Sequence, residues 1–229
     1  MKRLLRKAVN LVLDFFYPKE CLGCGVAKTY LCVSCLEKIS FLETQVCFLC
    51  HRPSIHALTH PRCVKKGDLD SLLVASVYEG LLKKIIKTFK YRFVQELSAP
   101  LAHMLVNLSK DKLPQVDLIT FVPITKHKQK LRGFNQAYLL AFHFAERQGL
   151  GCIATLAKLE ETKNQAELKR EERMANLKKA FTCTKNVAGK RILLLDDVST
   201  TGTTLNECSK ALKKSGATKV YGLVLARGI

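Results

Sequence analysis

The chain has 229 residues, of which 48% are apolar and 25% are charged. These proportions are typical of a folded globular protein and exclude a disordered or low-complexity chain. The chain has 38 lysine and arginine residues and 19 acidic residues, so its formal net charge is +19. Such a charge either increases solubility or favours an anionic partner such as nucleic acid, a phosphorylated metabolite or an acidic membrane surface.

The N-terminal segment predicts a short amphipathic helix rather than a signal peptide. Apolar residues recur at helical spacing from Leu5 to Phe16, on a segment that also carries several basic side chains. Its longest uninterrupted apolar run, Leu11 to Leu13, is far shorter than a signal-peptide core, and no segment is apolar for the ~18–20 residues that a membrane span needs. We therefore expect a cytoplasmic protein without a membrane span. The basic helix leaves open a peripheral position at the inner face of the membrane.

The next segment is rich in cysteine, with seven of the ten cysteines between residues 21 and 63. In a cytoplasmic protein such clustering indicates metal binding rather than disulfides. A C-x2-C turn can direct two thiolates at one zinc ion about 2.3 Å away, and two such turns complete a tetrahedral site. The first two turns therefore predict a structural zinc site of the zinc-ribbon kind, with the ligands Cys21, Cys24, Cys32 and Cys35.

A second zinc site is a weaker prediction, because only three cysteines of the segment remain for it. Its expected ligands are Cys47, Cys50, His60 and Cys63, with His60 standing where a fourth cysteine would complete another C-x2-C pair. His51 and His56 are alternative fourth ligands, and the pairs can also interleave between the two sites. Four-coordinate sites with no open position are structural, so we expect no zinc catalysis here.

Residues 1–67 are thus expected to form a domain of the N-terminal helix and the zinc ribbon, and residues 68–229 an α/β domain. In this second part strand and helix patterns alternate, which is typical of an open, mainly parallel sheet flanked by helices. The expected strands cover residues 71–78, 118–124, 191–195 and 219–226. The expected helices cover residues 81–93, 95–108, 134–148 and 203–214.

The most informative stretch is RILLLDDVSTTGTTL, from Arg191 to Leu205. A wholly apolar strand ends in Asp196 and Asp197, and a loop of small residues then leads into a helix. Unpaired N–H groups and the helix dipole favour an anion at such a helix start, so the loop is a candidate phosphate site. Its candidate ligand residues are Ser199, Thr200, Thr201, Gly202, Thr203 and Thr204. The two acids would repel phosphate and suit sugar hydroxyls or a Mg²⁺ shell instead, unless they only cap the loop.

This stretch resembles the phosphoribosyl-pyrophosphate signature of type I phosphoribosyltransferases. The resemblance implies that Asp196 and Asp197 hold the ribose hydroxyls and that residues 199–204 hold the 5-phosphate. Three features follow one another along the chain: the cysteine ribbon, the run RGFNQ at residues 132–136, and this signature. Their order resembles that of the ComF/GntX family of competence-protein F, phosphoribosyltransferase-like proteins. It implies a type I phosphoribosyltransferase fold with a small N-terminal zinc-ribbon domain. The chain departs from that family at His60, where a cysteine is expected, and at Lys158, where an arginine is expected.

The implied chemistry is displacement of pyrophosphate from the ribose, which releases a highly charged anion that Mg²⁺ and basic side chains must neutralise. The family's pyrophosphate loop would lie after the strand that ends near residue 124. We expect Thr125 and Lys126 to line the substrate site there and Lys126 and Arg132 to contact pyrophosphate, the alternative being a solvated basic turn. The polar segment from residue 160 to Arg173 is either a mobile hood over the site or a surface helix. Arg173 is its candidate substrate residue, and Arg173 and the nearby Asn176 are the positions to test.

Three functions remain open at this point: a phosphoribosyltransferase with an unidentified nitrogenous acceptor, a DNA-uptake factor, and a regulator that binds phosphoribosyl pyrophosphate without turnover. The family resemblance implies a role in natural transformation, in which the protein accompanies a helicase and handles single-stranded DNA. Four aromatic residues lie among basic ones and are candidates for base stacking, although core packing is expected for most of them. They are Phe89, Tyr91, Phe93 and Phe134.

Overall fold

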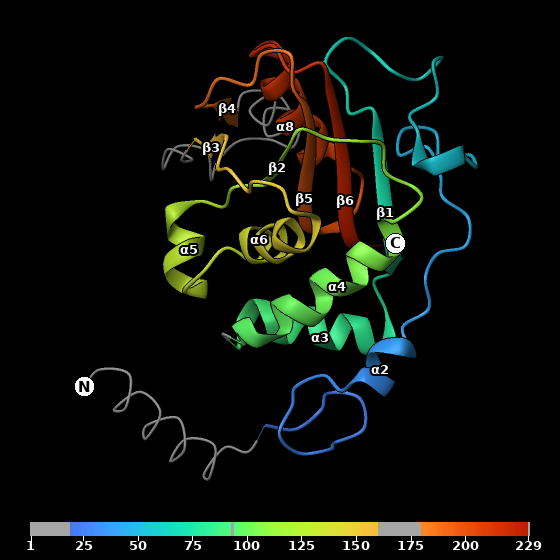
Figure 1. The fold of residues 1–229 in the computed structure, drawn as a ribbon, viewed down its shortest axis with the longest axis vertical. Helices are drawn as coiled ribbons and strands as arrows, with labels where there is room; N and C mark the ends of the chain where they lie inside the picture. Colours follow the sequence, from blue (N-terminus) through green and yellow to red (C-terminus); the bar gives the residue numbers. More distant parts are fainter. Residues whose placement is uncertain (1–18, 93, 160–179, 229) are drawn as a thin grey trace, which may run out of the picture.

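The computed structural model describes residues 19–92, 94–159 and 180–228 (Figure 1). The predicted N-terminal helix and the segment with Arg173 and Asn176 lie outside the described residues.

Four parallel strands form the central sheet, in the spatial order β1 (Ser71–Val77), β6 (Lys219–Arg227), β5 (Arg191–Ser199) and β2 (Leu118–Phe121). The start of β5 is buried on both faces, as its uninterrupted apolar run predicts for a central parallel strand. Arg227 of β6 lies opposite Ser199 of β5 and Val77 of β1, so the carboxyl ends of these three strands meet at one edge of the sheet. The neighbouring β2 ends earlier, at Phe121, opposite Leu195 of β5.

Helices cover both faces of this sheet (Figure 1). Three of them pack on one face: α3 (Gly80–Tyr91), α4 (Ser98–Ser109) and α6 (Gln136–Gln148). The other face carries α8 (Thr203–Lys214) and a short antiparallel hairpin of β3 (Leu156–Lys158) and β4 (Phe181–Cys183). Alternate residues of β5 serve the two faces, since Leu193 belongs to the first buried cluster and Leu194 to the second. The fold class expected from the sequence is confirmed.

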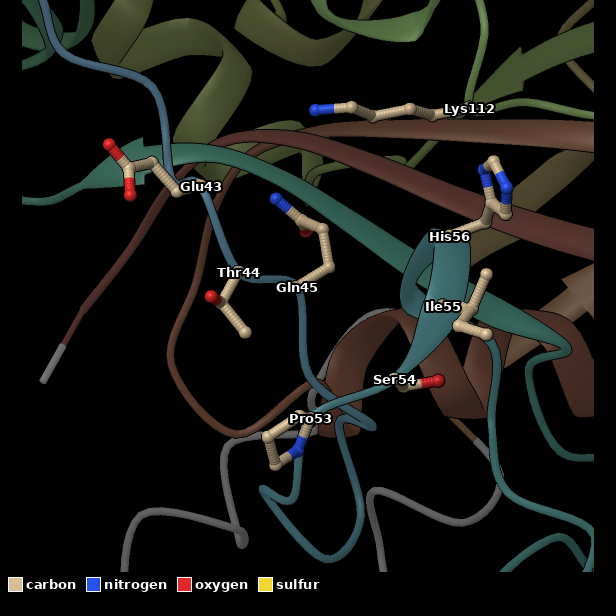
Figure 2. A pocket seen from close by; sticks show the side chains of 8 residues that line it. All are labelled: Glu43, Thr44, Gln45, Pro53, Ser54, Ile55, His56 and Lys112. Atoms are coloured by element: carbon tan, nitrogen blue, oxygen red, sulfur yellow. The ribbon is translucent and has the colours of Figure 1, made fainter.

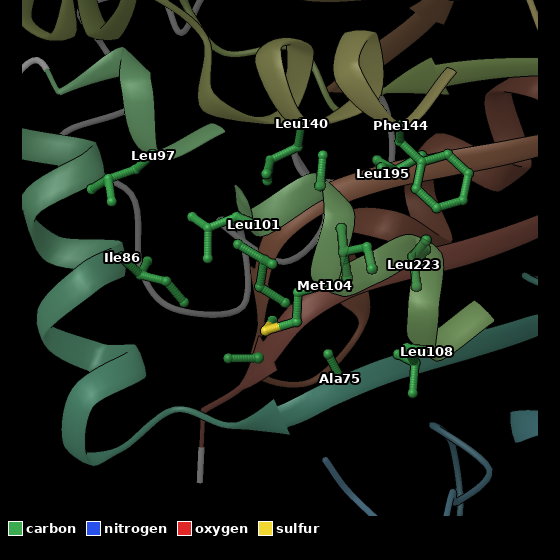
Figure 3. Packing of buried hydrophobic residues seen from close by; sticks show 14 of the residues in the cluster. Ala75, Ile86, Leu97, Leu101, Met104, Leu108, Leu140, Phe144, Leu195 and Leu223 are labelled. Carbon is green, nitrogen blue, oxygen red and sulfur yellow. The ribbon is translucent and has the colours of Figure 1, made fainter. Parts of the chain in front are cut away.

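Figure 3 shows the first of these buried clusters. Met104 and Leu108 of α4 and Phe144 of α6 lie in one cluster with Leu195 and Leu223 of the sheet. Burying side chains of this size stabilises the folded state by roughly 1.5–3 kcal/mol each. The cluster therefore anchors α4 and α6 on β5 and β6.

The cysteine-rich segment packs directly on this body and contains two short helical elements, α2 (Val33–Glu37) and η1 (Ile55–Ala57). Cys35 and Leu31 share the buried cluster of α3 and α4, whereas Phe48 belongs to the cluster of α8. The Gln45 amide donates to the Val74 carbonyl at 2.9 Å and accepts from its N–H at 3.1 Å, which covers part of the edge strand β1. The domain boundary after residue 67 stays a prediction.

Most of the predicted elements are present with shifted ends. β5 continues to Ser199 instead of ending at residue 195, so both acids of the signature lie within the strand. The strand expected to reach residue 124 ends at Phe121, two residues before Pro123, which has no N–H for a strand ladder. The helix expected from residue 95 is the short η2 (Gln95–Leu97) followed by α4, and the helix expected from residue 134 begins at Gln136, after a separate α5 (Lys126–Arg132).

Candidate functional site

The first four predicted zinc ligands converge in the structure. The sulfur atoms of Cys21, Cys24, Cys32 and Cys35 all lie within 4.8 Å of one another. The Cys32 sulfur is 3.6 Å from that of Cys21 and 3.7 Å from that of Cys24, close to the ~3.8 Å separation of sulfurs arranged tetrahedrally around zinc. A tight turn, closed by the Gly25 N–H on the Cys21 carbonyl, supplies the first pair, and the start of α2 supplies the second.

The protonation of these thiols also fits a cation. Burial opposes ionisation of Cys21, but backbone N–H groups of Cys32, Cys24 and Gly23 donate to its sulfur and lower its pKa to about 6. Hydrogen bonds with the neighbouring thiols, Cys32 above all, and burial raise the pKa of Cys35 to about 12. Adjacent thiols resist simultaneous ionisation unless a cation lies among them, and a zinc ion would displace their remaining protons.

The second predicted set converges as well, in sequence order and without interleaving. The ligand atoms of Cys47, Cys50, His60 and Cys63 lie within 4.8 Å of one another, with His60 Nδ1 3.2 Å from the Cys50 sulfur. His60 Nε2 lies 3.2 Å from the Pro53 carbonyl, which accepts the ring N–H and leaves Nδ1 free to ligate. A histidine ligand held by such a second hydrogen bond is the usual arrangement at protein metal sites.

The two alternative fourth ligands lie elsewhere among the described residues. His51 accepts a hydrogen bond at Nδ1 from the Arg227 guanidinium. His56 lines a pocket of about 410 Å³, and Figure 2 shows its side chain there with those of Ile55 and Lys112. His60, which stands where the family resemblance expects a cysteine, is therefore the fourth residue of the second ligand set.

The candidate phosphate loop, residues 199–204, joins the carboxyl end of β5 to the start of α8. Gly202 adopts a left-handed conformation with φ of 76° and directly precedes the helix, where the first N–H groups lack intrahelical partners. The side chains of Thr200, Thr201, Thr203 and Thr204 are exposed, and the hydroxyls of Thr201 and Thr203 lie 2.7 Å apart. Ser199 is buried, and its carbonyl accepts the Gly228 N–H at 3.0 Å. The Thr203 N–H donates to the Thr201 hydroxyl at 3.4 Å, so the other N–H groups of the first turn and the exposed hydroxyls are what the loop offers to an anion.

The two acids of the signature have different surroundings. Asp197 is buried and forms an ion pair with Lys90 of α3, with 2.7 Å between Lys90 Nζ and Asp197 Oδ1. The Asp196 carboxylate accepts the backbone N–H of Asp197 at 2.8 Å. Desolvation, followed by the charge of Asp197, raises the pKa of Asp196 to about 8 against the opposing effect of Lys90 and Arg132. The two carboxyls beside the loop therefore differ, since Asp197 pairs with Lys90 and Asp196 has a raised pKa.

Lys90 is a site residue that the sequence did not single out. It stands on a helix with several other lysines, and nothing in their spacing distinguishes it from a solvated basic residue. Only the packing of α3 against the sheet brings its ammonium group to Asp197.

The run RGFNQ is explained largely by local structure. The Arg132 guanidinium lies over the Tyr91 ring at 5.3 Å and donates to the Gln136 side chain at 3.1 Å. Gly133 ends α5 in a left-handed conformation, and Phe134 is buried. Asn135 caps α6 by accepting the N–H groups of Ala137 and Tyr138, and it donates to the Val122 carbonyl.

The structure places the other predicted pyrophosphate residues at α5, after the carboxyl end of β2. The Thr125 hydroxyl caps this helix by accepting the Lys128 N–H at 3.3 Å, and Lys126 is its exposed first residue. Arg132, at the other end of α5, acts electrostatically on Asp196. The basic turn and the acid pair therefore occupy neighbouring strand ends, as the carboxyl edge of a parallel sheet requires.

Comparison with known protein families agrees with this arrangement. The double zinc ribbon domain model matches residues 12–64, and the phosphoribosyl transferase domain model matches residues 147–228. The ribbon match, together with the two clusters, supports structural zinc. Among the described residues, no helix has the length and apolar character required to cross a membrane.

Three relatives cover most of the chain. Competence protein F of Haemophilus influenzae is 31% identical over 93% of this chain and 98% of its own length. Competence protein ComFC of Bacillus subtilis is 31% identical over 86% of this chain and 84% of its own. DNA utilization protein YhgH of Salmonella typhi is 31% identical over 86% of this chain and 90% of its own. These matches confirm the resemblance inferred from the sequence: the chain belongs to the family of competence protein F, in which a double zinc ribbon precedes a phosphoribosyltransferase domain.

Proposed function

We propose that this protein binds phosphoribosyl pyrophosphate with Mg²⁺ and acts as a phosphoribosyltransferase in natural competence and DNA uptake. The observation that carries the proposal is the loop of residues 199–204, whose exposed hydroxyls and helix start directly follow two acids at the carboxyl edge of the sheet. The names of the relatives support the competence role. The clustered thiols favour a cytoplasmic location, because ligands of this kind require a reducing compartment.

Each part of the substrate has a chemically matched partner in the proposed complex. The N–H groups at the start of α8 and the hydroxyls of Thr200, Thr201, Thr203 and Thr204 bind the 5-phosphate. Asp197 accepts hydrogen bonds from the ribose hydroxyls, and so does Asp196 once the bound cation favours its ionised form. Both then stabilise the positive charge that develops on the sugar. Lys126 and Arg132 orient the departing pyrophosphate and balance its charge.

The acid pair also fits a divalent cation. Carboxylate oxygens are hard ligands that suit Mg²⁺, and Mg²⁺ binds with substrate phosphates rather than in a cage of protein groups alone. When bound, the ion would neutralise charge on the pyrophosphate leaving group. Three of the described histidines, His103, His127 and His143, lie on three different helices, α4, α5 and α6, and we assign none of them as a general base, so the acceptor would supply its own nucleophile.

Calorimetric titration with phosphoribosyl pyrophosphate and Mg²⁺ tests the pocket. Asp196→Asn combined with Asp197→Asn should weaken binding by roughly 100-fold or more, because a hydrogen bond to a charged group contributes about 1.5–3 kcal/mol. Asp117→Asn is the matched control, since Asp117 pairs with Arg191 at the opposite end of β5 and should leave the affinity unchanged. Equal affinity of the double variant and the wild type would refute the pocket assignment.

A second function, the handling of single-stranded DNA beside a helicase, is favoured by the surface around α5. Lys126, Lys128 and Lys130 are exposed there, and the nearby Tyr91 ring is 65% exposed beneath Arg132. Phe89 and Phe134, by contrast, are buried in the core and do not present a face for base stacking, and Phe93 lies outside the described residues.

Binding of a fluorescent oligonucleotide at several salt concentrations tests this second function. Electrostatic binding predicts that log affinity falls linearly with log salt, by about 0.7 for each phosphate contact on a single strand. Tyr91→Ala should remove about 1–3 kcal/mol of stacking without changing that slope. An affinity that does not respond to salt would exclude this surface as a DNA-binding site.

A further inference from the structure

The ring of Phe48 contacts the candidate phosphate loop at Gly202. Phe48 lies between Cys47 and Cys50 in the second cysteine-histidine cluster and is 3% exposed. A Cβ atom added at Gly202 would lie 2.7 Å from Phe48 Cδ2 and 3.4 Å from Cε2, so the ring fills the space directly beside the Gly202 α-carbon. Leu205 and Cys208 of α8 belong to the same buried cluster. Gly202, the left-handed residue of the loop, therefore packs against a side chain that lies between two ligands of the second cluster.

A second connection runs through His51, which follows Cys50 directly. The Arg227 guanidinium donates to His51 Nδ1. Arg227 ends β6 opposite Ser199, and the next residue, Gly228, donates its N–H to the Ser199 carbonyl at 3.0 Å. The turn of the second cluster is thus linked to the loop at two places. It reaches Ser199 indirectly, through Arg227 at the end of β6, and Gly202 directly, through Phe48.

The chain that leaves the second cluster also holds α8. The Asn206 side chain, in the first turn of α8, accepts the Leu69 N–H at 2.8 Å and donates to the Asp68 carboxylate at 2.9 Å. Ser209, one turn further on, donates to the Gly67 carbonyl at 3.1 Å. These bonds join the first turns of α8 to the chain segment that follows the second cluster.

We propose that Phe48 is a positioning residue through which the second cluster holds the phosphate loop in its anion-binding form. Metal at Cys47, Cys50, His60 and Cys63 fixes the turn that carries Phe48, and the ring in turn supports Gly202. Metal binding at this cluster and phosphate binding at the loop therefore strengthen each other, because coupling between two binding sites is reciprocal. This inference rests on the proposed function, since it concerns the same phosphate site.

The first cluster provides a matched control within the same chain. Leu22 lies between Cys21 and Cys24 as Phe48 lies between Cys47 and Cys50. Leu22 packs against the cluster of α3 and α4, and its carbonyl accepts a hydrogen bond from Lys84 of α3. Its contacts are therefore with the helices of the opposite face from α8.

The test compares the full-length wild type with Phe48→Ala, Phe48→Leu and Leu22→Ala. Calorimetry measures affinity for phosphoribosyl pyrophosphate with Mg²⁺, and emission spectroscopy measures bound zinc. Phe48→Ala should weaken binding by about 5- to 150-fold while zinc is retained, which is the usual range of coupling between sites. Phe48→Leu should restore part of the affinity because leucine refills part of the space, and Leu22→Ala should stay within about 2-fold of the wild type.

A second measurement keeps the proposal falsifiable if Phe48→Ala does not fold. Zinc release from the wild type to a chromogenic chelator should slow for one of its zinc ions when phosphoribosyl pyrophosphate and Mg²⁺ are present. Phosphoribosyl pyrophosphate can itself bind zinc in solution, and the Asp196→Asn/Asp197→Asn protein controls for that effect. Zinc release from this variant should not slow when phosphoribosyl pyrophosphate is added.

Three results would overturn the inference. The first is a folded Phe48→Ala protein that binds as tightly as the wild type, and the second is an equal loss in Leu22→Ala, which would indicate general destabilisation. The third is a rate of zinc release that the ligand does not change. A wild type that binds no phosphoribosyl pyrophosphate would instead refute the proposed function, and this inference with it.

Discussion

Lys90 shows how a single residue supports the site without belonging to its signature. Its ammonium group lies 2.7 Å from the Asp197 carboxylate, and both side chains are largely buried, at 16% and 9% exposure. Removing one partner of such a pair leaves a buried charge without compensation. Lys90→Met should therefore lower the free energy of unfolding by about 3 kcal/mol in urea titrations, and the further change Asp197→Asn should restore part of it.

An exposed ion pair serves as the control for this prediction. Lys219 pairs with Asp70 at 3.0 Å but is 54% exposed, so Lys219→Met should cost under about 1 kcal/mol. Equal effects of Lys90→Met and Lys219→Met would show that the Lys90–Asp197 pair is no more important than a surface contact.

Asp196 gives the folded protein a predictable response to pH. Desolvation and the neighbouring Asp197 charge raise its pKa to about 8, above the value of about 4 expected in the unfolded chain. The folded state then holds a proton that the unfolded state releases, so stability is fully present below about pH 4 and is lost as pH rises towards about 8. Urea midpoints should fall more steeply over this window in the wild type than in Asp196→Asn. Parallel profiles would contradict the assigned direction.

At the scale of elements, Asn135 determines where α6 begins. Its side chain accepts the N–H groups of Ala137 and Tyr138 and donates to the Val122 carbonyl, which ties the helix to the end of β2. Asn135→Ala should lower the free energy of unfolding by about 1–2 kcal/mol, the usual cost of losing an N-cap, as measured by urea unfolding. A change below about 0.3 kcal/mol would indicate that the cap is replaced by water.

Sequence patterns predicted the elements well where local chemistry determines them. The apolar run at residues 191–195 correctly indicated a central strand. The C-x2-C spacing predicted which cysteines form pairs, but only the structure shows that consecutive pairs share one site. The strand end was misplaced because two acids look like a loop, although pairing with β6 carries the strand on to Ser199. Lys90 and Phe48 could not be predicted, since their partners Asp197 and Gly202 are distant in sequence and only the folded chain brings them together.

At the scale of the whole molecule, the cysteine-rich segment contributes to the common core. Cys21 and Cys35 lie in the same buried cluster as residues of α3, α4 and the sheet, so loss of the first metal should affect more than the segment itself. Cys21→Ser should lose about one zinc ion per chain and lower the melting temperature of the whole protein, because metal binding contributes folding free energy. Emission spectroscopy and calorimetry measure these two quantities.

Cys183 is the matched control for that variant. It lies outside both sets of zinc ligands and is only partly buried, so Cys183→Ser should keep the wild-type zinc content. Full zinc content in Cys21→Ser would contradict the first metal site.

The loop at the start of α8 and the adjacent acids form the proposed phosphoribosyl-pyrophosphate site. A crystal structure of the wild type grown with phosphoribosyl pyrophosphate and Mg²⁺ would show whether the ligand binds there. We predict density for the 5-phosphate against residues 199–204 and for the ribose hydroxyls beside Asp196 and Asp197. An empty loop at saturating ligand, or ligand bound elsewhere on the protein, would contradict the claim.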